Sequence, residues 1–200
     1  MKTGEIFERM ALRYDTEERR RNAAVIADAM RRELAGTHGK RALDYGCGTG
    51  LVGLALLDLF ASMLFVDTSP QMVAQVELKL EAAGATTGST LCADFTTQPP
   101  PDIKVDVILV SQVLLHVKDY ALLLRRLYGL LDPGGQLLIV DFDKNERIVS
   151  DLVHNGFDQA GLTGLLKEIG FANVSTHTFF HGEKLFMNMD ASQFILKATK

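Results

Sequence analysis

Short apolar runs alternate with amphipathic segments along nearly the whole 200-residue chain, and this alternation is the strongest constraint on its fold. Strands that are separated by helices pair in parallel, so the pattern predicts an α/β fold whose parallel sheet carries helices on both faces. Such a sheet binds ligands at the carboxyl ends of its strands, beside the topological switch point. We expect strands at 41–45, 62–67, 89–94, 105–112, 136–142, 173–180 and 192–200.

Cap residues and apolar stripes define the expected helices between these strands. Asp15 is the expected cap of the first helix, and Gly36 is expected to end it. Ser69 caps a later helix that Gly84 closes. The segment "DPGG" before the fifth strand is a turn signal. We expect the remaining helices at 51–60, 121–131 and 159–169.

The segment "LDYGCGTGLVG" (Leu43–Gly53) fits two cofactor fingerprints at once. Gly48, Gly50 and Gly53 satisfy G-x-G-x-x-G, the dinucleotide loop in which backbone amides at a helix N-terminus hold a pyrophosphate. Asp44, followed by glycine at every second position, satisfies D-x-G-x-G-x-G. A carboxylate just before the loop repels a pyrophosphate but suits a ligand that carries an ammonium group, such as S-adenosylmethionine.

In this loop and in four later segments, the sequence resembles the class I S-adenosylmethionine-dependent methyltransferases, particularly their small-molecule and quinone-type members. The resemblance covers most of the chain and implies a single methyltransferase domain over residues 1–200. It also implies a Rossmann-like, seven-stranded, mostly parallel sheet whose last strand is antiparallel. "RYDTEERR" at 13–20 is similar to the family's N-terminal lid, so residues 1–35 are expected to form a helical lid segment. The matching segments are "LDYGCGTG", "LFVDTSPQMV", "CADF", "VDVILVSQVLLHV" and "LDPGGQLLIVDF".

The resemblance implies a binding site for S-adenosylmethionine as cofactor. Gly46 and Gly48 let the backbone approach the methionine part, and Asp44 serves its ammonium group through water. Asp67 accepts hydrogen bonds from both ribose hydroxyls, as a fork-shaped carboxylate can. The full expected set is Tyr14, Asp44, Gly46, Gly48, Gly50, Asp67, Thr68, Met72, Asp94, Phe95 and Ser111.

Other members of this set have narrower implied roles. Asp94 accepts from the adenine amino group, and the Phe95 backbone N–H faces the ring. Met72 packs near the adenosine, the Ser111 carbonyl meets the ammonium group, and Tyr14 closes over the methionine end. Structural explanations stay open beside these roles: the aspartates can be helix or turn caps, and the methionine and tyrosine can be packing residues.

His116, in "VLLHV" after the fourth strand, is the best candidate for a catalytic base, because histidine titrates near neutral pH. A histidine packed beneath the following helix explains the residue equally well. We expect no metal site, since no spacing of histidine, cysteine and acidic residues indicates one. Asp141 and Asp143 are better explained as a solvated strand end than as magnesium ligands.

Composition limits the compartment and the partners. A formal net charge of −4 disfavours nucleic acid and anionic membranes as partners, and Arg19–Arg21 fits a solvated helix face. Two cysteines make neither a disulfide framework nor a four-ligand zinc site. The sequence shows no signal-peptide or membrane-spanning pattern, so we expect a cytoplasmic location.

These features predict an enzyme that transfers a methyl group from S-adenosylmethionine to a small organic molecule. Two alternatives stay open: a non-catalytic member of the fold that binds cofactor or a protein partner, and a nicotinamide-dependent oxidoreductase. The second requires a downstream catalytic constellation that the sequence does not offer. The sequence specifies neither the methyl acceptor nor the oligomeric state.

Overall fold

Seven strands form one sheet at the centre of the computed structural model, which describes residues 15–200. The strands are β1 (Arg41–Tyr45), β2 (Ser62–Asp67), β3 (Gly88–Cys92), β4 (Val105–Ser111), β5 (Leu131–Phe142), β6 (Ala172–Phe186) and β7 (Met189–Thr199). Their order in the sheet is β3-β2-β1-β4-β5-β7-β6. The five strands β1 to β5 pair in parallel, whereas β7 is antiparallel to both of its neighbours. This arrangement confirms the predicted sheet.

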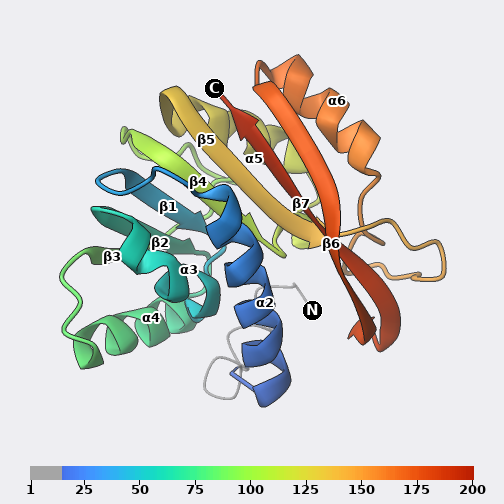
Figure 1. The fold of residues 1–200 in the computed structure, drawn as a ribbon, viewed down its shortest axis with the longest axis horizontal. Coiled ribbons are helices and arrows are strands. Elements are labelled where there is room, and N and C mark those ends of the chain that lie inside the picture. Colours follow the sequence, from blue (N-terminus) through green and yellow to red (C-terminus); the bar gives the residue numbers. More distant parts are fainter. Residues whose placement is uncertain (1–14) are drawn as a thin grey trace.

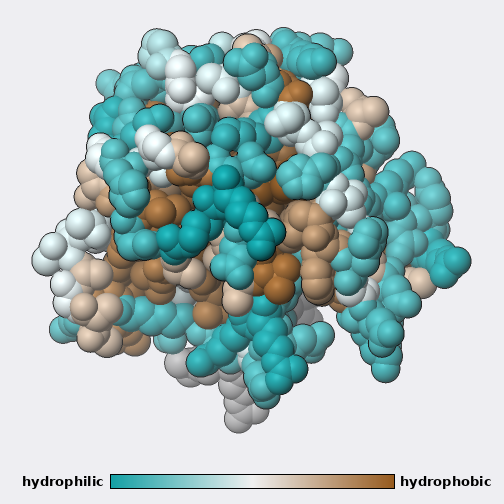
Figure 2. Space-filling view, in the orientation of Figure 1, coloured by the Kyte–Doolittle hydropathy of each residue, from teal (hydrophilic) through white to brown (hydrophobic). Residues whose placement is uncertain are grey.

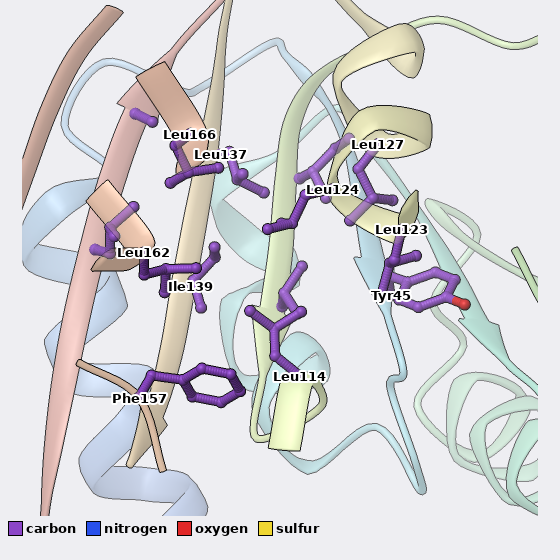
Figure 3. Close-up of a cluster of buried hydrophobic side chains, with 14 of the residues drawn as sticks. Tyr45, Leu114, Leu123, Leu124, Leu127, Leu137, Ile139, Phe157, Leu162 and Leu166 are labelled. Atoms are coloured by element: carbon purple, nitrogen blue, oxygen red, sulfur yellow. The ribbon is translucent and has the colours of Figure 1, made fainter. Parts of the chain in front are cut away.

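Helices cover both faces of the sheet, as the alternating pattern predicts. They are α2 (Glu17–Glu33), α3 (Leu51–Leu56), α4 (Pro70–Ala82), α5 (Tyr120–Leu130) and α6 (Gln159–Ile169), with short 3₁₀ turns η2 (Leu57–Leu59) and η3 (Leu114–His116). Val107 and Leu109 pack with α2, α3 and α4, whereas Ile108 and Val110 pack with α5 and α6. Figure 1 shows α2 and α5 on opposite sides of the sheet, and Figure 3 shows the leucines of α5 and α6 packed on their face. Successive side chains along a strand thus point to opposite faces of the sheet and pack into one of two apolar layers.

The helix α2 has one buried and one solvated side. Arg20 and Arg21 are exposed, and the view of this side of the molecule shows mostly hydrophilic residues over α2 (Figure 2). Arg19 is half-buried and faces a cavity described below. The buried residues of the helix are Ala23, Ile26, Ala27, Ala29 and Met30.

The start of α2 corrects the expected cap. Thr16 is the N-cap, and its Oγ1 accepts a hydrogen bond from a backbone N–H three residues on, at 3.3 Å. Asp15 instead forms an ion pair with Lys79 Nζ at 2.7 Å and accepts a hydrogen bond from Thr49 Oγ1. Because Thr49 belongs to the glycine-rich loop after β1, Asp15 ties the start of α2 to that loop.

Three central strands end at one edge of the sheet. Tyr45 at the end of β1 is in register with Val66 of β2 and with Val110 of β4. The chain after each of these strands therefore leaves the sheet at the same place. The strand order reverses between β1 and β4, so this edge is also the topological switch point at which α/β sheets bind ligands.

Two segments differ from the expected elements. The "DPGG" segment lies inside β5 as a bulge, because Leu131 pairs with Val105 and the next pair is Gln136 with Val107. The last two strands are longer than expected and join at Met187–Asn188, where both residues have left-handed φ values of 53° and 60°. Figure 1 shows the β6–β7 hairpin projecting past the rest of the sheet.

The expected lid at residues 1–35 lies only in part within the described residues. Its second half contains α2, whereas Tyr14 lies outside the described residues. Within residues 15–200, no helix combines the length and the apolar character needed to cross a bilayer.

Replacing Gly53 tests the packing that joins α3 to the sheet. A Cβ atom at Gly53 would lie 2.3 Å from Asp44 Oδ2 and 2.6 Å from Phe65 Cε1. Gly53→Ala is therefore expected to destabilise the protein by about 1–3 kcal/mol through overpacking. Gly164→Ala in α6 is the control, because its Cβ would meet nothing within 4 Å and the helix would gain about 0.5–1 kcal/mol. Denaturant unfolding measures both, and an unchanged midpoint for Gly53→Ala would contradict this packing.

Candidate active site

A cavity of about 560 Å³ opens where β1, β2 and β4 end. Segments from α2, the glycine-rich loop, the ends of β2 and β4, and the chain around η3 all contribute to its wall. The residues of the predicted site that line it are Gly46, Gly48, Asp67, Thr68, Met72, Asp94, Ser111 and His116. The sequence-based prediction and the cavity therefore select the same edge of the sheet.

The glycine-rich loop turns sharply between β1 and α3. Gly46 has a φ of 70°, and a Cβ at this position would lie 2.4 Å from Val113 Cγ2. Gly48 has a φ of 54°, and Gly50, with a φ of 81°, is the N-cap of α3 and does not line the cavity. L-residues with side chains rarely adopt these angles, so the alternate glycines are required by the turn itself.

Asp44 lies buried beneath this loop, at the end of β1, and is 2% exposed. Its Oδ2 atom has no hydrogen-bond partner among residues 15–200. Burial, and next the charge of nearby Asp67, raise the pKa of Asp44 to about 7, although the neighbouring backbone N–H of Gly53 acts to lower it. A buried carboxyl group with an unused oxygen is costly in an apolar interior and would be stabilised by a cation.

Asp67 is held at the end of β2 by two backbone N–H groups. Its Oδ2 accepts from Gly48 N at 2.8 Å, and its Oδ1 accepts from Ser69 N at 2.9 Å. Burial raises the pKa of this carboxyl group despite these hydrogen bonds. Each oxygen keeps a further lone pair, so the fork that faces the cavity can also accept hydroxyl groups from a ligand.

Asp94 and Phe95 follow β3, and their contacts modify the expected roles. Asp94 Oδ1 accepts from Thr96 N at 2.8 Å and from Thr96 Oγ1 at 2.6 Å, so the residue caps a turn while it lines the cavity. The Phe95 N–H, expected to face an adenine ring, donates instead to Tyr45 Oη at 3.1 Å. Phe95 itself is fully buried and stacks on the Tyr45 ring, with centroids 5.0 Å apart. Tyr45 reaches the cavity from β1 and is a site residue that the sequence reasoning missed.

Met72 fits both of its interpretations. It is 1% exposed and belongs to the buried side of α4, yet it also lines the cavity. Its N–H donates to Ser69 Oγ at 3.4 Å, which caps the helix as expected.

The segment after β4 carries a polar side chain that the sequence analysis did not assign to the site. Gln112 has a φ of 55°, a left-handed conformation that is uncommon for a residue with a side chain. Its Oε1 accepts a hydrogen bond from Asn22 Nδ2 of α2 at 3.2 Å, and both residues line the cavity. No local pattern in the sequence pairs these two residues, because their proximity depends on how α2 crosses the sheet.

His116 lies in η3 on the cavity wall. Burial lowers the pKa of its imidazole to about 4, so the ring is neutral at pH 7. The turn that carries it is supported by Asp141, whose Oδ2 accepts from Leu115 N at 3.3 Å. A neutral imidazole can accept a proton, although a base with so low a pKa is weaker than ordinary histidine.

Asp141 near the end of β5 and Asp143 just after it have different surroundings. No cluster of three or more His, Cys, Asp or Glu side chains suited to a metal ion occurs among residues 15–200. Asp141 is completely buried rather than solvated, and burial raises its pKa to about 7. Asp143 accepts hydrogen bonds from Gln159 Nε2 at 2.6 Å and from Thr178 Oγ1 at 2.8 Å, which ties β5 to α6 and β6.

Comparisons with known proteins agree with this geometry. A family model described as a methyltransferase domain matches residues 43–139, from β1 through most of β5. A ubiquinone biosynthesis O-methyltransferase of Pseudomonas aeruginosa is 31% identical over 116 residues, which cover 58% of this chain and 50% of that relative. The chain thus spans about half the length of such curated relatives.

Solved structures show the same fold. A SAM-dependent methyltransferase from Aquifex aeolicus superposes with a TM-score of 0.72 at 18% identity, covering 96% of this chain and 97% of the other. A Haemonchus contortus phosphoethanolamine N-methyltransferase in complex with phosphomonomethylethanolamine and S-adenosylhomocysteine superposes with a TM-score of 0.72 at 16% identity. In that pair the match covers 87% of this chain and 52% of the other. Residues 43–139 therefore belong to the methyltransferase domain family, and the sheet around them has the fold of these solved methyltransferases.

Proposed function

We propose that this protein transfers a methyl group from S-adenosylmethionine to a small organic molecule. The observation that carries the proposal is the pair of carboxyl groups around the glycine-rich loop: Asp44 buried beneath it and Asp67 at its side. These acids match a ligand that has an ammonium group and a ribose diol and no phosphate. A dinucleotide would bring a pyrophosphate to the same loop, next to two carboxyl groups.

The residues around the loop offer groups that suit the parts of the cofactor. Asp44 Oδ2 supplies an acceptor that has no hydrogen-bond partner among residues 15–200, and Gly46 and Gly48 line the cavity where the methionine part would lie. Asp67 would hold the ribose, and the wall formed by Thr68, Met72 and Asp94 would receive the adenine. The cofactor supplies a methyl group activated on a sulfonium, so the main contribution of the chain's residues is to bind and align the reactants.

We further propose a small-molecule acceptor and a cytoplasmic location. The acceptor would enter the same cavity from the side of α2 and η3, where Asn22, Gln112 and His116 line the wall. A net charge of −4 gives little attraction for nucleic acid. The free thiol of Cys47 fits a reducing compartment.

Binding of S-adenosylhomocysteine, the reaction's second product, tests the cofactor assignment. Calorimetry is expected to show binding by the wild type and at least about tenfold weaker binding by Asp67→Ala, because a hydrogen bond to a charged group contributes about 1.5–3 kcal/mol. Asp67→Asn keeps one acceptor oxygen and should fall between the two.

The control is Asp58→Ala, which removes an exposed carboxylate that pairs with Arg31 outside the cavity. It should leave the affinity for S-adenosylhomocysteine unchanged. Absence of binding by the wild type, or tighter binding of NAD than of S-adenosylhomocysteine, would overturn the proposed function.

His116 is proposed as the proton acceptor for hydroxyl substrates. With a pKa near 4 the ring is already neutral at pH 6, so His116→Asn should slow turnover by a similar factor, about tenfold or more, throughout pH 6–8. The affinity for S-adenosylhomocysteine should not change. His177→Asn, at an exposed position of β6, is the matched control.

The measurement is kcat for the best acceptor from a screen of phenols, thiols and amines. Wild-type turnover by the His116→Asn variant would show that the histidine is a packing residue. An inflection near pH 6.5 that the variant lacks would contradict the depressed pKa.

A further inference from the structure

Three side-chain amides connect the interior of the sheet to the cavity. Gln193 of β7 donates from Nε2 to Asn22 Oδ1 of α2 at 3.1 Å. Asn22 in turn donates from Nδ2 to Gln112 Oε1 at 3.2 Å. The three residues are far apart in sequence, and the two hydrogen bonds run in the same direction, from Gln193 toward the cavity.

Gln193, at the buried end of this series of hydrogen bonds, has a side chain that is costly to bury. Gln193 is 0% exposed, and its Oε1 has no hydrogen-bond partner among residues 15–200. It lies in the middle of β7, in register with Phe142 of β5 and Phe180 of β6. An apolar residue would suit such a position better, since a buried amide that is only partly hydrogen-bonded costs stability.

The backbone of Gln112, at the cavity end of the series of hydrogen bonds, is strained. Gln112 has a φ of 55° and is held there by its backbone N–H, which donates to Val140 O at 2.7 Å. Strained backbone of this kind is often found where a side chain must be aimed at a ligand. Gln112 directly follows Ser111, the residue proposed to meet the methionine end of the cofactor, and it shares the cavity wall with His116.

The direction of the two hydrogen bonds decides what Gln112 offers to a ligand. Because Asn22 engages Oε1, the Nε2 group with its two N–H donors is the part of the amide left to meet a molecule in the cavity. We propose that Gln193, Asn22 and Gln112 form an amide relay, in which the first two are positioning residues and Gln112 donates hydrogen bonds to an oxygen of the methyl acceptor.

This inference deepens the proposed function, on which it rests. It restricts the acceptor to molecules with a hydrogen-bond-accepting oxygen, such as a carboxylate, a carbonyl or a phenolate, next to the atom that receives the methyl group. A cationic amine without such an oxygen would place its own donors against those of Gln112.

Binding of two small probes to the protein saturated with S-adenosylhomocysteine tests the relay. The probes are benzoate, which offers oxygen acceptors, and benzylamine, which offers ammonium donors. NMR titration of the wild type is expected to show tighter binding of benzoate, with a shift of the Gln112 side-chain NH₂ signals. These signals are assigned by their absence in Gln112→Glu.

Two near-isosteric variants are expected to reverse the preference. Gln112→Glu keeps the oxygen that accepts from Asn22 but turns a carboxylate oxygen toward the cavity. Asn22→Asp can no longer donate to Gln112 Oε1, so the Gln112 amide should turn over and present its oxygen. Each variant should bind benzoate about tenfold more weakly and prefer benzylamine.

Two further variants separate the relay from general effects on stability. Gln193→Leu removes the inner amide and should weaken benzoate binding severalfold while leaving the affinity for S-adenosylhomocysteine unchanged. Gln136→Leu is the matched control, because Gln136 also has a buried amide oxygen without a partner among residues 15–200 but lies on β5 outside the cavity wall. It should change neither probe's affinity.

The outcomes distinguish the relay from the proposed function. If S-adenosylhomocysteine itself does not bind, the proposed function fails. If it binds but the wild type prefers benzylamine, binds neither probe, or keeps its preference in Gln112→Glu and Asn22→Asp, the relay is overturned and the cofactor assignment stands.

Discussion

The burial of a carboxyl group at the end of β1 is the constraint on which the rest of the site depends. Asp44 is 2% exposed, and Gly53 of α3 packs so closely that a single methyl group would collide with its Oδ2. Burial makes the charged form expensive, which raises the pKa of Asp44 to about 7. The fold therefore holds, directly beneath the glycine-rich loop, a carboxyl group whose charged form a nearby cation would stabilise.

Other elements of the edge follow from that arrangement. The glycine turn places the Gly48 N–H against Asp67, so the loop and the end of β2 orient each other. On its other side the loop is tied to the start of α2 through Asp15, Lys79 and Thr49, because Lys79 Nζ also donates to Thr49 O at 2.6 Å. The helix α2, which borders one side of the cavity, is thus fixed to the glycine-rich loop, which borders another. A change in the position of the loop should therefore alter the position of α2 through these few contacts.

Local sequence signals predicted much of this fold. The limits of β1 and β2 and the start of α4 follow from short apolar runs and from the Ser69–Pro70 cap, and the structure has them as expected. Local sequence signals failed to predict strand limits where pairing with a neighbouring strand determines them. "DPGG" resembles a free turn, but β4 holds it as a bulge within β5, and the β6–β7 hairpin is extended by its own cross-strand pairs.

The candidate site was likewise predictable only where local sequence determines it. Acids and glycines at strand ends are readable because their chemistry and spacing are local, and Asp67 and Asp94 do line the cavity. The hydroxyl of Tyr45 could not be foreseen as the partner of the Phe95 N–H, since the two are fifty positions apart and meet only in the folded sheet. The same is true of Gln112 and Asn22, whose contact depends on a strained backbone and on the crossing of α2.

Proton release on binding of S-adenosylhomocysteine tests the central role of Asp44 most directly. At pH 6 the buried carboxyl group is mostly protonated, because its pKa is about 7, and an ammonium group nearby would lower that pKa and expel the proton. Calorimetry in two buffers of different ionisation enthalpy should therefore show net proton release at pH 6, and an affinity that rises toward pH 7. Asp44→Asn should abolish the release. Binding without proton release at pH 6, or the same release from the Asp44→Asn variant, would contradict the account.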